Sequence, residues 1–260
     1  MRIFIVCVFL MTSCASIKYE DISNSIVADS GSFIFLDPKK AGLNGYFIKR
    51  ENKEFLVYGL PYVDEDTVIK IGDYELLILR KDFGESRIEI LDQNLVLPKL
   101  ADQKRASAEY LKVQKIIQNR SKQFTEKFEF QTPIESVITS AFGKRRFINN
   151  NERSPHMALD IRGEVGKEIV APMAGKVVMA ETHFYGGNKI ILDDGGGLFT
   201  AYSHLNEFNV QEGAIVNQGD VIGFVGMTGR VTGPHLHWEV YLNQERINPE
   251  LLVNLKLAQD

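Results

Sequence analysis

Four of the five histidines in this 260-residue chain fall in three short segments that have the pattern of metal ligands or catalytic bases. The segment from His235 to Tyr241 alternates polar and apolar residues, which is typical of a half-buried strand. Residues two apart on a strand share a face, so the imidazoles of His235 and His237 are expected to point the same way. A single H-x-H pair arises by chance in under about one chain in ten of this composition, so alone it is weak evidence.

Two further segments supply similar chemistry. His156 and Asp160 are four residues apart and share a face on either a strand or a helix, while Pro155 and Gly163 favour extended structure around them. His204 lies at the end of another strand-like segment, and Tyr202 is expected on the same face as a possible helper. Imidazoles with one carboxylate are the ligands of catalytic zinc sites, which keep one position open. The residues alone leave open which of His235 and His237 binds metal, and two histidines with a carboxylate also suit a non-haem iron centre.

The elements that must position these residues are mostly β-strands. Residues 23–100 alternate short apolar strands with turns and predict a small accessory β domain. Residues 101–127 are predicted to form an amphipathic linker helix, since apolar residues recur there at helical spacing between lysines and arginines. Residues 128–255 return to short strands bounded by Gly, Pro and Asn, which predicts an antiparallel β-sheet domain built from hairpins. The fold class expected is therefore mostly β.

The first residues have the layout of an export signal. Arg2 is followed by a short apolar run from Ile3 to Met11, too short to cross a bilayer core of about 30 Å as a helix. Small residues then precede Cys14, which resembles the lipobox of bacterial lipoproteins. Residues 1–13 are thus expected to be a lipoprotein signal peptide, with Cys14 carrying the lipid that attaches the protein to a membrane. The residues after Cys14, Ala15 and Ser16, resemble the sorting pattern for the periplasmic face of the outer membrane.

Charge and cysteine content exclude other classes. The formal net charge is −4, and it becomes −5 when Arg2 leaves with the signal peptide, so no nucleic acid is expected as a partner. Both cysteines, Cys7 and Cys14, lie in the leader region, which leaves the mature chain no pair to oxidise.

Taken in order, five motifs in residues 130–253 resemble the lysostaphin/LytM-type zinc endopeptidases of bacterial cell walls. The resemblance is specific because the motifs follow the order and spacing of that family. They are the segments 140–146 (SAFGKRR), 156–160 (HMALD), 169–177 (IVAPMAGKV), 202–205 (YSHL) and 228–240 (TGRVTGPHLHWEV).

The resemblance implies the roles of the residues and the substrate. His156, Asp160 and His237 would hold one zinc ion (Zn2+), and His204 and His235 would be catalytic histidines that do not bind it. The expected activity is an endopeptidase that hydrolyses the cross-linked stem peptides of peptidoglycan. Alternatives are a zinc carboxypeptidase that trims stem peptides and a catalytically idle module that binds the cell wall and activates an amidase. No role is assigned to His183.

Overall fold

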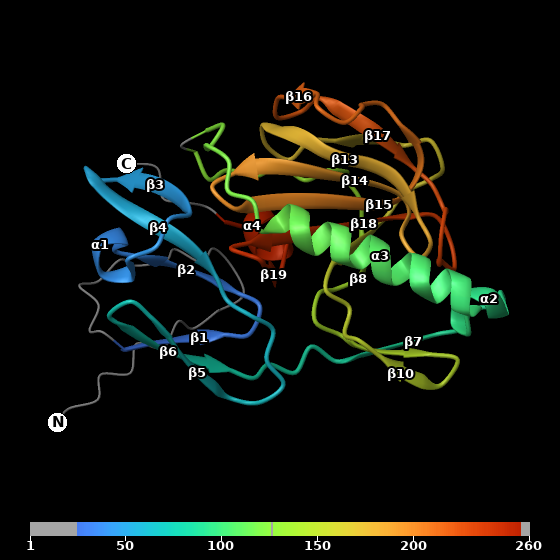
Figure 1. The fold of residues 1–260 in the computed structure, drawn as a ribbon, viewed down its shortest axis with the longest axis horizontal. Helices are drawn as coiled ribbons and strands as arrows, with labels where there is room; N and C mark the ends of the chain where they lie inside the picture. The colour runs from blue at the N-terminus through green and yellow to red at the C-terminus, as the bar shows by residue number, and fades with distance from the viewer. Residues whose placement is uncertain (1–24, 126, 256–260) are drawn as a thin grey trace.

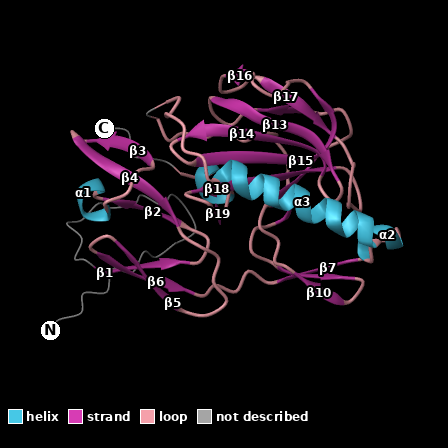
Figure 2. Ribbon diagram, viewed as in Figure 1, coloured by secondary structure: helices cyan, strands magenta, loops and turns pink. Residues whose placement is uncertain are grey.

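A computed structural model describes residues 25–125 and 127–255, so the predicted signal peptide and Cys14 lie outside the described residues. The predicted mostly β fold is confirmed: strands dominate, and α3 is the one long helix among the described residues (Figure 2). In the described part of the chain, no helix combines the length and apolar character needed to span a bilayer.

The N-terminal region contains two small three-stranded sheets and a short helix (Figure 1). In the first sheet, β6 (Tyr74–Leu79) lies between β1 (Ser25–Asp29) and β5 (Thr67–Ile71). In the second, β4 (Lys53–Gly59) lies between β2 (Phe33–Leu36) and β3 (Tyr46–Arg50), and α1 spans Pro38–Ala41.

This second sheet packs against the C-terminal region without a break in the apolar core. Phe33 and Tyr46 are buried in the same cluster as Phe128, Leu242 and Ile247. Because the two regions share one core, we expect them to unfold together.

A ten-stranded antiparallel sheet forms the C-terminal region; it carries four of the five histidines, and His156 lies in the segment just before β11. Its path runs β16-β13-β14-β15-β18-β11-β8, while β12 and β17 pair with each other and β19 pairs with β18. Its strands are β8 (Ile138–Ser140), β11 (Leu159–Arg162), β12 (Glu168–Val170), β13 (Gly175–His183), β14 (Gly187–Gly195), β15 (Leu198–Phe208), β16 (Ile215–Val216), β17 (Val221–Val225), β18 (His235–Leu242) and β19 (Glu245–Ile247), and α4 follows at Glu250–Val253.

A smaller sheet joins the two regions. It consists of β7 (Glu85–Ile88), β9 (Arg145–Ile148) and β10 (Asn151–Arg153), with β9 in the middle. The bounds expected for the accessory domain (residues 23–100) and for the peptidase domain (residues 128–255) stay predictions. Within the range expected for the accessory domain, however, β7 pairs in parallel with β9 of the C-terminal region.

The predicted linker helix is present as α3 (Leu100–Ile117), after the short helix α2 (Gln93–Val96). It ends ten residues before the expected boundary at 127, because the following residues bond to both regions in extended form. The side chain of Gln123 bonds the backbone of Phe47 on both sides, and the carbonyl of Ser121 accepts from Gly196. These bonds replace the ones that further helical turns would make.

One face of the large sheet carries the histidines and is also covered in part by α3. Successive outward residues of β18 on this face are His237, Glu239 and Tyr241. Tyr241 packs with Val113 and Ile117 of α3. The helix thus covers one part of the face (Figure 1), and His237 lies four residues before Tyr241 on the same strand.

Candidate metal centre and active site

Asp160 and His237 are direct neighbours across two antiparallel strands. The register of β11 and β18 places Asp160 opposite His237, so both side chains leave the same face of the sheet. Asp160 Oδ1 lies 2.7 Å from His237 Nδ1. The alternation of β18 that the sequence predicted is thus confirmed, with Leu236, Trp238 and Val240 fully buried on the opposite face.

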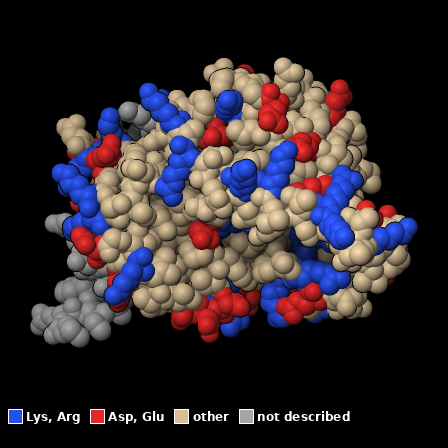
Figure 3. All heavy atoms as spheres, viewed as in Figure 1, with Lys and Arg blue, Asp and Glu red and all other residues tan. Residues whose placement is uncertain are grey.

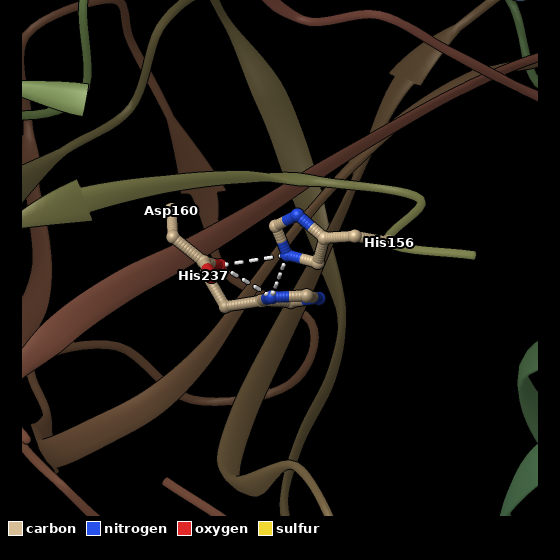
Figure 4. A group of neighbouring side chains, drawn as sticks. All are labelled: His156, Asp160 and His237. Carbon is tan, nitrogen blue, oxygen red and sulfur yellow. Dashed lines mark hydrogen bonds and ion pairs between the residues drawn. The ribbon is translucent and has the colours of Figure 1, made fainter. Parts of the chain in front are cut away.

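His156 reaches the same point from the segment that precedes β11 (Figure 4). Its Nε2 atom lies 3.0 Å from Asp160 Oδ1 and 3.3 Å from His237 Nδ1. One ligand atom from each of the three residues lies within 4.8 Å of the other two. The three residues expected to hold the metal therefore converge on one point.

The orientation of His156 is set from behind. Its Nδ1 atom lies 3.0 Å from the carbonyl oxygen of Ala141, and Ser140 Oγ is 3.1 Å away. A carbonyl can only accept, so Nδ1 carries the proton and Nε2 presents its lone pair to Asp160 and His237.

This donor set fits a divalent cation. When His156 is neutral, its Nε2 and Asp160 Oδ1 are two acceptors 3.0 Å apart, an unfavourable contact that a shared cation would turn into coordination. Burial alone would raise the pKa of the Asp160 carboxyl, but His237 and His156 outweigh it and hold that pKa well below its ordinary value. The ionised carboxylate with two imidazoles matches the three protein ligands of a catalytic zinc site.

His204 enters the site through an unusual backbone conformation. Simple alternation along β15 would place His204 on the core face with Tyr202, but its φ is +68°, in the left-handed region. Its ring accordingly lies beside those of His235 and His237, with centroids 5.0 and 5.5 Å away. Such strain in a residue other than glycine is typical of functional sites.

Tyr202, in contrast, does not reach the site. It is fully buried in the core, where its hydroxyl donates to Thr200 Oγ1. The expectation that Tyr202 shares the face of His204 is wrong, because the left-handed residue reverses the alternation between them.

His204 and His235 are oriented in the same way. The Nδ1 atom of His204 lies 2.8 Å from the carbonyl of Thr228, and that of His235 lies 2.8 Å from the carbonyl of Gly233. In the neutral form of either ring, the carbonyl fixes the proton on Nδ1 and leaves Nε2 as an acceptor. His235 Nε2 is 3.8 Å from Asp160 Oδ1, beside the point on which the three ligand atoms converge.

Burial also keeps His204 uncharged. It lowers the pKa of the imidazole well below its ordinary value, and the charges of His237 and His235 act in the same direction. A neutral ring with a directed lone pair can accept a proton near neutral pH.

Thr228 is a supporting residue that the motif analysis did not single out. Its carbonyl orients His204, its hydroxyl donates to the carbonyl of Leu205, and the same hydroxyl accepts from the backbone of Asn188. The turn residue Gly187 has φ +60°, and a Cβ there would lie 2.2 Å from Thr228 Oγ1. The only signal in the sequence was the position of Thr228 at the start of the motif at residues 228–240.

His183 lies apart from the other four histidines. It is buried at the end of β13, and its Nε2 has no hydrogen-bond partner among the described residues. Its surroundings include Glu109 and Val113 of α3.

Comparison with known proteins agrees with this geometry. Residues 154–249 match the model of peptidase family M23. The chain is 37% identical over 129 residues to peptidoglycan DD-endopeptidase ShyA of Vibrio cholerae, a match that covers 48% of this chain and 30% of ShyA. It is 34% identical over 122 residues to DD-carboxypeptidase/endopeptidase Mpg of Neisseria meningitidis, with 47% of this chain and 28% of Mpg covered. The chain thus spans less than a third of the length of these two relatives.

A solved structure extends the likeness in fold beyond the histidine-bearing region. The crystal structure of a candidate peptidase M23 from Pseudomonas aeruginosa superposes with a TM-score of 0.67 at 24% identity, covering 86% of this chain and 94% of that one. Residues 154–249 of the present chain therefore resemble a peptidase M23 domain. The family resemblance predicted from the sequence motifs is confirmed.

Proposed function

We propose that this protein is a zinc metalloendopeptidase that hydrolyses peptide cross-links of bacterial peptidoglycan. The observation that carries the proposal is the convergence of His156, Asp160 and His237 on one point, with two further imidazoles oriented beside it. The name of the relative ShyA, a peptidoglycan DD-endopeptidase, supports peptidoglycan as the substrate.

In this mechanism His156, Asp160 and His237 hold a single zinc ion. When bound, zinc polarises the scissile carbonyl and lowers the pKa of a coordinated water. His204 and His235 then serve as the two catalytic histidines. Each presents Nε2 while its Nδ1–H is held by a backbone carbonyl. One accepts the proton of the attacking water at Nε2 and passes it to the leaving amine as the peptide bond breaks. The other, after taking up a proton from solvent at Nε2, donates a hydrogen bond to the oxyanion that develops on the substrate.

The direct test is digestion of purified sacculi by the mature protein, with and without a chelator. We expect cross-linked muropeptides to be lost in the untreated sample alone, and zinc to restore the chelated sample. Mass analysis of the products would contradict the proposal if the cross-links stayed intact. Elemental analysis of protein purified without added metal would contradict the zinc assignment if it found iron.

Trimming of stem peptides is the second candidate, because Mpg is named both as a carboxypeptidase and as an endopeptidase. The same digestion separates the two activities, since a carboxypeptidase releases a terminal residue and leaves cross-links in place. An idle module that activates an amidase would act equally well after His237→Ala.

We further propose that the protein is exported as a lipoprotein attached through Cys14 and facing the periplasm from the outer membrane. In this arrangement residues 1–13 are removed, residues 23–100 form an accessory domain, and residues 128–255 form the peptidase domain. The lipobox-like segment supports the anchor. Membrane fractionation of a Cys14→Ser variant tests it: the variant is expected in the soluble fraction, and its continued sedimentation with membranes would contradict the anchor.

A further inference from the structure

Three arginines beside the candidate active site have no acidic partner among the described residues. Arg146 of β9 and Arg153 of β10 are direct cross-strand neighbours, so their side chains leave the same face of that small sheet. Arg230 lies in the loop before β18, and its guanidinium carbon is 4.2 Å from the centre of the Tyr185 ring. Figure 3 shows Lys and Arg atoms gathered below α3, over β7 and β10.

The side chain of Arg230 reaches the small sheet: its guanidinium donates to the carbonyl of Leu95, and Leu95 packs in the cluster that contains Ile148 of β9. Burial lowers the pKa of the Arg230 guanidinium, and the charges of Arg146 and Arg153 act in the same direction. Burial likewise lowers the pKa of Arg146. Holding like charges together in half-buried positions lowers the stability of the fold. An anion bound between them would offset this cost.

Neighbouring Arg145 shows what an ordinary arginine does on the same strand. It points to the opposite face of β9 and pairs with Glu152 at 2.9 Å and Glu85 at 3.4 Å. In contrast, Arg146, Arg153 and Arg230 have no carboxylate within 4.0 Å among the described residues. Among the described residues, the guanidinium of Arg230 donates one hydrogen bond, to the carbonyl oxygen of Leu95 at 3.4 Å.

The position of the cluster relates it to the candidate active site. Arg230 follows Thr228, whose carbonyl orients His204, by two residues, and its backbone N–H donates to the carbonyl of Tyr185. Arg146 follows Lys144 by two residues, and the carbonyl of Lys144 accepts from the backbone N–H of His156. The arginine cluster therefore lies next to the histidines of the candidate site.

We propose that Arg146, Arg153 and Arg230 form a subsite that binds a free carboxylate of the substrate peptide near the bond to be cut. The guanidinium group presents paired N–H donors whose spacing matches a carboxylate, and such bonds are stronger than neutral ones. The subsite rests on the proposed function, since stem peptides supply free carboxylates on acidic residues and at their ends. It makes the enzyme selective for anionic peptides.

The test compares two forms of one cross-linked muropeptide dimer, one with free carboxylates and one with those groups converted to amides. The full-length zinc-loaded protein should cut the free form with a kcat/KM about tenfold or more above that of the amidated form, since charged hydrogen bonds carry enough free energy. Arg153→Gln and Arg230→Gln should lower kcat/KM on the free form to that of the amidated form and leave the amidated form unaffected. Arg145→Gln is the matched control and should retain the full preference.

Each outcome bears on the subsite. Equal cleavage of both forms by the unaltered protein overturns it while leaving the proposed peptidase intact, and so does a full preference in Arg153→Gln and Arg230→Gln. Failure to cut either form removes the proposed function, and the subsite with it. Thermal unfolding of the variants is expected at or above the temperature of the unaltered protein, because removing one arginine relieves repulsion. This readout separates loss of binding from loss of fold.

Discussion

Two polar clusters lie side by side on the same face of β18, yet they differ in the balance between hydrogen-bond donors and acceptors. His237 belongs to the candidate metal centre, and Glu239, two residues further along, belongs to an ionic cluster near α3. Glu239 pairs with Lys189 and accepts from Arg246 Nε at 3.0 Å and from the Tyr241 hydroxyl at 2.9 Å.

The difference lies in the balance of donors and acceptors. Around Glu239 the positive groups and the hydroxyl supply enough protons to bond both carboxylate oxygens. Burial would raise the pKa of Glu239, but Lys189 and Arg246 outweigh it and hold that pKa well below its ordinary value. At the metal centre, His156 Nε2 and Asp160 Oδ1 are acceptors turned toward each other. Burial of polar groups is therefore common to both clusters, and an excess of converging lone pairs is what distinguishes a site for a cation.

Asp160→Asn should have the largest effect on activity. The amide keeps the shape of the side chain but removes the negative charge, so the metal is lost with its Lewis acid contribution of several kcal/mol. We expect peptidoglycan cleavage to fall about 10³-fold or more. Metal content measured on the same sample should fall in parallel. Glu168→Gln on β12 is a control with an unaffected rate, and full activity of Asp160→Asn would refute the assignment of this residue.

His204→Ala should separate chemistry from metal binding. The ring lies beside the ligands without being one, so we expect zinc to remain at one ion per chain while kcat falls about 10²- to 10⁴-fold. His183→Ala removes a histidine that is remote from the others and should leave kcat unchanged. Loss of zinc from His204→Ala would show that the catalytic histidines and the metal ligands are not functionally distinct.

Glu239→Gln should affect stability more than any other single change in the ionic cluster. The substitution leaves the buried ammonium of Lys189 and the half-buried guanidinium of Arg246 without their shared counter-charge. Breaking a buried ion pair in this way typically costs about 3–5 kcal/mol of unfolding free energy. Urea denaturation measures the loss, and a change below about 1 kcal/mol, the usual value of an exposed pair, would mean that the cluster contributes no more than a surface contact.

The sequence predicted the parts of this comparison that depend on local periodicity. Alternation placed His235 and His237 on one face, and the i to i+4 spacing grouped His156 with Asp160. It could not place His204, because the left-handed conformation that turns its ring into the site leaves no pattern in the residue types. The role of His204 came from the family motif, and the same alternation misplaced Tyr202.

Contacts between distant segments were also beyond the sequence. β7 pairs with β9 across about sixty residues, and α3 packs on the face of the sheet that carries the histidines. Both depend on which surfaces meet after the sheet has formed, so no local pattern encodes them. The arginine cluster has the same origin, since Arg230 joins Arg146 and Arg153 through the fold alone.

Asp194 extends the comparison to a buried carboxylate with no counter-charge. Both of its oxygens lack hydrogen-bond partners among the described residues, and burial raises its pKa well above the ordinary value. The folded state therefore holds a proton that the unfolded state releases. This contribution to stability is complete below the unfolded pKa and is lost as the pH rises through the folded pKa. We expect Asp194→Asn to weaken that decline, as measured by unfolding across pH. An unaltered pH profile would contradict the assignment.

The ion pair between Lys112 of α3 and Glu181 of β13 should have the smallest effect, although its groups are as well matched as Lys189 and Glu239. The two side chains are 50% and 36% exposed, so water and salt screen their attraction. We expect Glu181→Gln to cost at most about 1 kcal/mol, and the cost to shrink further in high salt. If this variant instead lost as much stability as Glu239→Gln, burial would not be what separates the two pairs. The helix would then depend on its polar contacts with β13 more than on the packing of Val113 and Ile117 against the sheet.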